Sequence, residues 1–212
     1  MLDLEKLSGA VRLRFQGAKG SHDWEHTQRV LALALHLARV EGAEADIVHC
    51  AALLHDIARS EEDLSNGKID HAIRGAELTA GILKDLGGAP DFIRRVAHCI
   101  AAHRFRGTLA PETLEAKVLF DADKLDAIGA VGIGRAFLFA GEVGANLHNP
   151  GVKVENTQPY TEEDTAYREF QVKLRKVKDR VLTVEGRRLA QARHEFMTAF
   201  FERLNQEVAG DL

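Results

Sequence analysis

Helical periodicity is the feature that most constrains how this chain can fold. Apolar residues recur three and four positions apart through most of its 212 residues, as they do along one face of an α-helix. Only four prolines occur, and Pro90, Pro150 and Pro159 fall in breaks between these segments. No stretch alternates apolar and polar residues as a half-buried strand does. The sequence therefore predicts an all-α fold.

Eight segments have a helical pattern. They cover residues 3–16, 24–41, 43–59, 70–86, 90–104, 111–139, 162–182 and 185–208. We expect Ser21 to cap the second helix, Gly42 to end it, and Thr161 to cap the seventh. Residues 60–68 are expected to form a polar loop, and residues 143–161 the longest irregular segment. The apolar residues that we expect to line the buried faces of the first and last helices are Leu4, Leu7, Val11, Leu13, Leu189, Ala192, Phe196, Ala199 and Phe200.

Composition excludes several classes of protein. The net charge of −4, without a basic stripe interleaved with aromatic residues, makes nucleic acid an unfavoured partner. No apolar stretch approaches the roughly 20 residues that span a bilayer, and the N-terminus lacks the order of a signal peptide. Cys50 and Cys99 lie inside apolar helical patterns and are interpreted as buried thiols in a reducing compartment. We expect a cytoplasmic protein with no membrane partner.

Two adjacent metal-capable side chains, His55 and Asp56, end the apolar run of residues 51–58. Burying either one without a partner would cost several kcal/mol, so we expect something to be bound there. His26 upstream and Asp123 downstream can complete a set of two imidazoles and two carboxylates. Such nitrogen and oxygen ligands suit Mn²⁺, Mg²⁺, Fe²⁺, Co²⁺, Ni²⁺ or Zn²⁺ in an open site. The absence of thiolates argues against a closed structural zinc site.

Each of these residues also has a simpler interpretation, because a single histidine on a helix is usually a core or surface residue. We assign that role to His36, His49, His148 and His194. Asp121 and Asp126 can be cap or surface carboxylates. Only the combination of four ligands, each at the apolar-to-polar edge of a helix, favours a metal site.

The residues of this set resemble a known signature. His26, residues 54–56 and residues 122–125 are similar to the H…HD…D pattern of HD-domain metal-dependent phosphohydrolases. Three longer motifs resemble those of a subfamily of small stand-alone bacterial HD proteins. They are HDWEHTQRV at 22–30, DADKLDAIGAVGIGR at 121–135 and TVEGRRLA at 183–190. The resemblance implies an all-α HD-domain helical core with a C-terminal helical extension. We therefore expect one domain over 1–212, with a core of about 20–142, the irregular loop and C-terminal helices at 162–208.

The same resemblance implies hydrolysis of a phosphate ester or anhydride. It points to nucleotides as substrates, including the release of pyrophosphate from nucleoside triphosphates. His71 and His103 resemble the extra histidines of HD proteins that hold two metals, whereas His98 lies about 140° away from His103 around a helix. We favour one ion per chain, with His71 and His103 on the substrate side, over two ions.

Water activated by the ion is expected to attack phosphorus. Candidates for proton transfer are His71, Glu61 and Glu62, although the two glutamates can equally belong to a solvated loop. The substrate phosphate requires local cations, for which we favour Lys124, Arg29 and Arg104, ahead of Arg106 and Arg135.

Two other functions remain open at this point. The substrate can be a cyclic nucleotide or another phosphodiester, or the chain can be a regulatory module that senses a nucleotide without catalysis. The amphipathic last helix can pack on the core or on a second copy in a homo-oligomer. Residues 129–134 have the order GxxGxG, preceded by no strand, so we interpret them as a site of close helix packing and not as a nucleotide loop.

Overall fold

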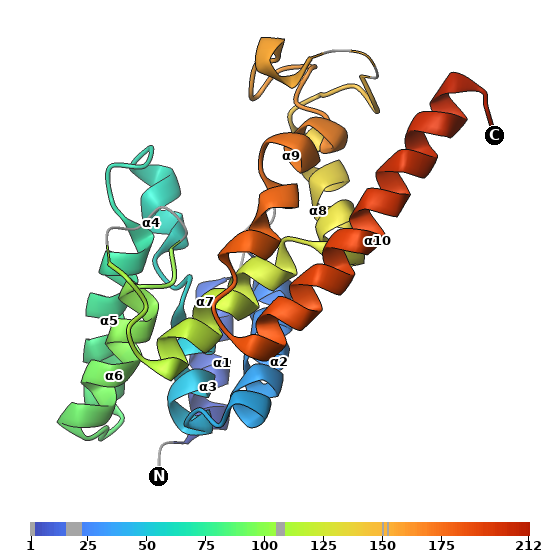
Figure 1. Cartoon of the computed structure of the whole chain (residues 1–212). Coiled ribbons are helices and arrows are strands. Elements are labelled where there is room, and N and C mark those ends of the chain that lie inside the picture. Colours follow the sequence, from blue (N-terminus) through green and yellow to red (C-terminus); the bar gives the residue numbers. More distant parts are fainter. Residues whose placement is uncertain (1–2, 16–22, 105–108, 150, 152) are drawn as a thin grey trace. The chain divides into compact units, whose positions relative to one another are not determined.

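All regular structure in the described residues is helical. The computed structural model describes residues 3–15, 23–104, 109–149, 151 and 153–212, and none of these residues forms a strand (Figure 1). The all-α prediction is confirmed. The helices are α1 Leu4–Arg14, α2 Trp24–Glu41, α3 Ala45–Leu54, α4 Arg59–Leu64, α5 His71–Asp85, α6 Pro90–Ala101, α7 Leu114–Asp126, α8 Gly129–Glu142, η1 Val154–Asn156, α9 Ala166–Val172, η2 Leu174–Arg180 and α10 Val184–Ala209.

The chain divides into two compact units. The first contains residues 1–123 and 182–186, and the second contains residues 124–181 and 187–212. In the first unit α5 packs on α6, α2 packs on α3, and α3 also contacts α6 and α1. In the second unit α9 packs on α8 and on η2. The single domain expected from the sequence stays a prediction.

Helix α3 is the central helix of the first unit. Its neighbours lie on several sides, and every residue from 50 to 58 is buried. From Cys50 onward α3 is apolar all round, and such a segment is stable only where other elements cover it. The chain is therefore still buried where α3 ends, and His55 and Asp56 lie in the interior of the first unit.

The end of α3 differs from the prediction. The helix was expected to run to residue 59, but it ends at Leu54, and residues 55–58 form a turn. Backbone hydrogen bonds between residues three positions apart tighten the chain here, from Ile57 N to Leu54 O (3.1 Å) and from Arg59 N to Asp56 O (2.9 Å). The expected polar loop at 60–68 was also wrong in part, because α4 occupies its first half.

The long helix expected over residues 111–139 is broken into α7 and α8. Gly129 has a φ of +80°, which interrupts the helix and favours glycine. A Cβ atom on Gly132 would lie 2.3 Å from the Ala127 carbonyl oxygen, so this position also requires glycine. Close packing, as predicted, holds for Gly129, whose Cα faces the Arg193 side chain, but a Cβ on Gly134 would meet nothing within 4 Å.

Two of the expected helix caps were misplaced. Asp23 caps α2, its carboxylate accepting from His26 N at 2.8 Å, whereas Ser21 lies outside the described residues. Thr165 and not Thr161 caps α9, which is much shorter than expected and is followed by the separate 3₁₀ helix η2. The ending of α2 at Gly42 and the irregular segment before α9 are as predicted, apart from the short η1.

The buried face of α10 was predicted wrongly in part, although Leu189 and Phe200 are partly buried. Ala192 and Ala199 are exposed and Phe196 is 52% exposed, while the helix buries Ala190, Met197 and Phe201. Small and apolar residues occur on more than one face of α10, so spacing alone does not identify the face that packs. In α1, Leu7 and Val11 are buried as expected, but Leu13 is 63% exposed.

Candidate metal centre

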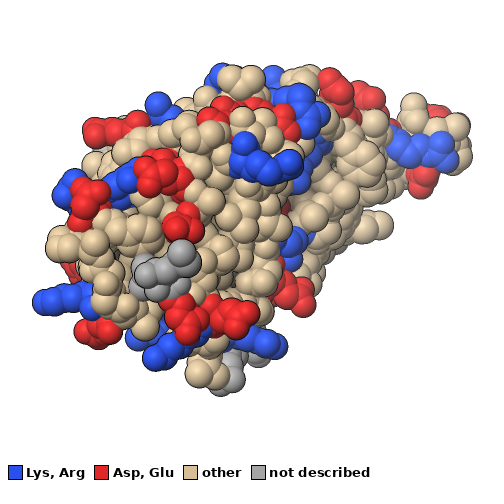
Figure 2. Space-filling model, turned by 90° about the horizontal axis from the view of Figure 1, so that it is seen from below, with Lys and Arg blue, Asp and Glu red and all other residues tan. Residues whose placement is uncertain are grey.

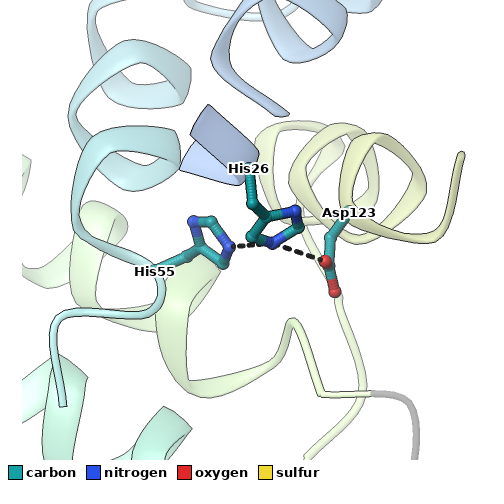
Figure 3. A group of neighbouring side chains, drawn as sticks. All are labelled: His26, His55 and Asp123. Carbon is teal, nitrogen blue, oxygen red and sulfur yellow. Dashed lines mark hydrogen bonds and ion pairs between the residues drawn. The ribbon is translucent and has the colours of Figure 1, made fainter. Parts of the chain in front are cut away.

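Three of the four predicted ligands form one group. His26 lies in the first turn of α2, His55 in the turn after α3, and Asp123 on α7 (Figure 3). His26 Nε2 is 3.3 Å from His55 Nε2 and 3.5 Å from Asp123 Oδ1. Both histidines are fully buried. These residues come from distant positions in the sequence, and their ligand atoms lie within 4.8 Å of one another.

Asp56 belongs to a second group with His71 and His103, whose ligand atoms also lie within 4.8 Å of one another. Asp56 Oδ1 is 3.4 Å from His71 Nε2 and 3.6 Å from His103 Nε2. Its other oxygen, Oδ2, is 3.6 Å from His26 Nε2 and 3.5 Å from His55 Nε2. The carboxylate of Asp56 therefore lies between two pairs of imidazole nitrogens, and we call all six residues the His/Asp cluster.

In three of these rings Nδ1, the nitrogen that points away from the cluster, has a partner that orients the ring. His55 Nδ1 donates to Ala52 O at 2.8 Å, and His103 Nδ1 donates to Ile100 O at 2.6 Å, because a carbonyl oxygen can only accept. His71 Nδ1 contacts the carboxylate of Glu62. All three rings consequently present Nε2 to the cluster.

Burial favours the neutral form of two of these rings. It lowers the pKa of His55 to about 4, although the nearby Asp56 carboxylate acts in the opposite direction. Burial also lowers the pKa of His71, again against the effect of Asp56. Near pH 7 a neutral ring with its proton on Nδ1 carries a lone pair on Nε2. Lone pairs and carboxylate oxygens thus converge in the His/Asp cluster, which suits a divalent cation bound by nitrogen and oxygen.

The other predicted site residues have varied positions. Glu62 is buried against His71 and Arg104, while Glu61 pairs with Arg74 through a 2.8 Å contact. Arg104 donates to Glu62 and Asp70. Arg29 is partly buried one turn after His26 in α2, and Lys124 follows Asp123 in α7 and belongs to the second unit. Arg135 pairs with Asp126 at 2.7 Å. Arg106 lies outside the described residues.

The four histidines that were given a simpler role from the sequence lie outside both groups, and so does His98. His98 Nε2 accepts from Glu112 N, and His36 and His148 contact Glu185 and Asn205. Two contacts at His71 were not predicted from the sequence: Glu62 aims its ring, and Asp70 caps α5 where His71 begins it. An aspartate before a helical pattern is a usual N-cap signal and identifies Asp70. No local pattern identifies the contact between Glu62 and His71.

The fold and the site together define an all-α protein in which helix ends bring histidines and aspartates into a buried, metal-type cluster. This chain belongs to the HD domain family, whose model matches residues 23–128. The resemblance inferred from the sequence motifs is confirmed. All six residues of the His/Asp cluster fall within the matched range.

One sequence relative and two solved structures match most of the chain. YpgQ of Bacillus subtilis (strain 168) is 39% identical over 197 residues, which cover 89% of this chain and 85% of YpgQ. The crystal structure of Bacillus subtilis YpgQ in complex with ADP superposes with a TM-score of 0.73 at 34% identity, covering 96% of this chain and 94% of that one. An HD-superfamily hydrolase from Bacillus thuringiensis superposes with a TM-score of 0.77 at 30% identity, covering 97% and 96%.

Helix composition and surface charge bear on contacts with a membrane or with nucleic acid. No helix within the described residues combines the length and the apolar character that crossing a membrane requires. On the face drawn in Figure 2, the described basic and acidic side chains are interspersed.

Proposed function

We propose that this chain is a divalent-metal-dependent phosphohydrolase that hydrolyses a nucleoside phosphate, in particular a nucleoside triphosphate with release of pyrophosphate. The observation that carries the proposal is the position of the Asp56 carboxylate between two pairs of buried imidazole nitrogens. A nucleotide as ligand is supported by the YpgQ structure, which contains ADP. HD-superfamily hydrolase relatives support hydrolysis as the reaction.

The residues fit two ions better than the single ion favoured from the sequence. His26, His55 and Asp123 would hold one ion with Asp56 Oδ2, and His71 and His103 would hold the other with Asp56 Oδ1. Each oxygen of Asp56 has its own pair of imidazole nitrogens at 3.4–3.6 Å, so Asp56 would belong to both sets of ligands. In this proposal His71 and His103 are ligands, and not groups on the substrate side.

Bound divalent ions supply positive charge to phosphoryl oxygens and lower the pKa of coordinated water toward about 7. The chain's own residues hold and orient that charge. Three of the four imidazoles are aimed by their Nδ1 partners, and their burial limits competition from bulk water. His71 Nδ1 and Glu62 are engaged with each other, so we assign them to orientation and not to proton transfer.

The substrate phosphates need cations because the chain carries a net charge of −4. We propose Lys124 and Arg29 for this role, since both lie within one helical turn of a cluster residue along the sequence. Arg104 is less suited, because its guanidinium is already shared between Glu62 and Asp70.

The proposal is tested by turnover of a nucleotide panel with Mn²⁺, Mg²⁺, Co²⁺ and Ni²⁺, with products identified by mass spectrometry. We expect a nucleoside triphosphate to give pyrophosphate, and Asp56→Asn to abolish turnover in folded protein. Cleavage of cyclic nucleotides alone would identify a phosphodiesterase. Nucleotide binding without any turnover would identify a sensing module.

A further inference from the structure

The guanidinium of Arg104 joins two carboxylates beside the His/Asp cluster. Its Nη2 donates to Glu62 Oε1 at 2.8 Å, and its Nη1 donates to Asp70 Oδ2 at 2.7 Å. The planar guanidinium fork holds both carboxylates in one geometry, which a lysine could not do. Arg104 also follows His103 directly in the chain.

Both of these carboxylates act on His71. Glu62 Oε2 accepts a hydrogen bond from His71 Nδ1, while Glu62 Oε1 accepts one from Arg104. Asp70 Oδ1 accepts from Ala72 N at 2.9 Å and so caps α5, whose first residue is His71. The ring of His71 and the helix start that carries it are therefore held by two groups that Arg104 links.

This support differs from that of two other cluster rings. His55 and His103 donate to neutral backbone carbonyls of the turn that precedes each of them. A carboxylate partner aims an imidazole and also raises its basicity as a metal ligand. The Arg104 guanidinium lies 2.8 Å from the other oxygen of the same Glu62 carboxylate and holds that carboxylate against His71. The donor strength of His71 thus depends on side chains outside the His/Asp cluster.

We propose that Glu62 and Arg104 are positioning residues that set the affinity for the ion held by His71, His103 and Asp56, separately from the ion held by His26, His55 and Asp123. This inference rests on the proposed two-ion site. Removing such a partner of a metal-bound imidazole typically lowers metal affinity about 10- to 100-fold. Glu62→Gln and Arg104→Gln should therefore weaken one ion and leave the other unchanged.

The chain offers a matched control in Glu61. It precedes Glu62 on α4 and also pairs with an arginine, Arg74, at 2.8 Å, but both side chains of that pair are more than a third exposed. Glu61→Gln removes the same charge from the same helix without touching His71. Any effect that is specific to Glu62→Gln must then come from the contact with the cluster ligand.

The experiment titrates Mn²⁺ into chelator-treated full-length protein, with heat measured by calorimetry and free Mn²⁺ by electron paramagnetic resonance. Wild type and Glu61→Gln should each bind two ions per chain, and the affinity of each binding step should be the same in both proteins. Glu62→Gln and Arg104→Gln should lose about 10- to 100-fold in one step only. Arg104→Lys keeps the positive charge but loses the planar guanidinium, so it should weaken that same step by less than Arg104→Gln does.

Glu62→Asp serves if Glu62→Gln does not fold, since its shortened side chain should weaken the same step. Two steps of wild-type affinity in these variants would overturn the inference while leaving the proposed two-ion site intact. Equal weakening of both steps would also overturn it, because Glu62 would then act on the cluster as a whole. Fewer than two ions in the wild type would refute the two-ion site and this inference together.

Discussion

Thr183 donates both its backbone N–H and its hydroxyl to one carboxylate oxygen of Asp121, at 2.7 Å and 2.6 Å, across 62 positions of sequence. The other oxygen of Asp121 accepts from Leu182 N at 2.8 Å. Asp121 is fully buried, and Thr183 is nearly so. This contact attaches the segment before α10 to α7, two residues before the predicted ligand Asp123.

Asp121→Ala should therefore destabilise the protein. The substitution leaves three donors without their acceptor, and losing hydrogen bonds to a buried charged group should cost about 3 kcal/mol or more. The free energy of unfolding from urea denaturation measures this cost. Thr183→Ser keeps the hydroxyl and should lose far less, so equal losses in the two variants would contradict this account.

The His/Asp cluster predicts a graded loss of ions. Asp56→Ala removes the carboxylate whose two oxygens contact imidazoles of both groups, and it should therefore abolish retention of both ions. His103→Ala should leave about one ion per chain. Metal quantitation after purification without chelator, with circular dichroism as a control for folding, distinguishes the variants. Wild-type metal content in Asp56→Ala would rule out the cluster as the binding site.

The two cysteines should be inert in the folded protein. Burial raises the pKa of both Cys50 and Cys99 to about 12, from 9.0 for an ordinary thiol, and neither side chain is exposed. A thiol-specific reagent at pH 8 should label neither residue in native protein and both in guanidinium chloride. Labelling of native protein at the denatured rate would contradict the burial of these thiols.

The same pKa shift predicts how stability changes in alkali. The folded pKa lies above the unfolded one, so the unfolded chain releases thiol protons first. The thiol contribution to stability is fully present below pH 9 and is lost as the pH rises from 9 toward 12. The urea midpoint should fall over this interval, and the fall should be smaller in the Cys50→Ala, Cys99→Ala double variant.

Two glycines of α8 should respond oppositely to alanine. At Gly132 a Cβ would lie 2.3 Å from a backbone oxygen, so Gly132→Ala must displace the chain and should cost about 1–3 kcal/mol. At Gly134 a Cβ meets nothing within 4 Å, so Gly134→Ala should raise stability by about 0.5–1 kcal/mol through helix propensity. Thermal unfolding of the two variants tests this, and the same sign in both would refute it.

Local chemistry explains which parts of the fold could be predicted. The bounds of α2 follow from its apolar stripe and from Gly42, and they agree with the prediction to the residue. The break between α7 and α8 could not be predicted from periodicity, because apolar spacing continues through it while the backbone is extended at Ile128 and left-handed at Gly129. The face of α10 was missed because packing partners, and not spacing, determine which residues are buried.

The candidate site divides in the same way. His55 and Asp56 were identified because two metal-capable side chains at the end of an apolar run need a bound partner. The grouping of His71 and His103 with Asp56 depends on how α5 and α6 pack, which no local pattern encodes. The contacts of Glu62 and Arg104 are likewise tertiary, so the sequence suggested these residues but not their partners.

The Nδ1–H groups of His55 and His103 each close the last turn of the helix that precedes them. The polypeptide alone therefore aims these two rings, and capturing an ion requires no rearrangement of the backbone around them. Replacement of one divalent ion by another should proceed at the speed of ligand exchange, without any step of chain reordering. The metal carried in the cell would then follow local supply and relative affinity, and would not be locked in when the protein folds.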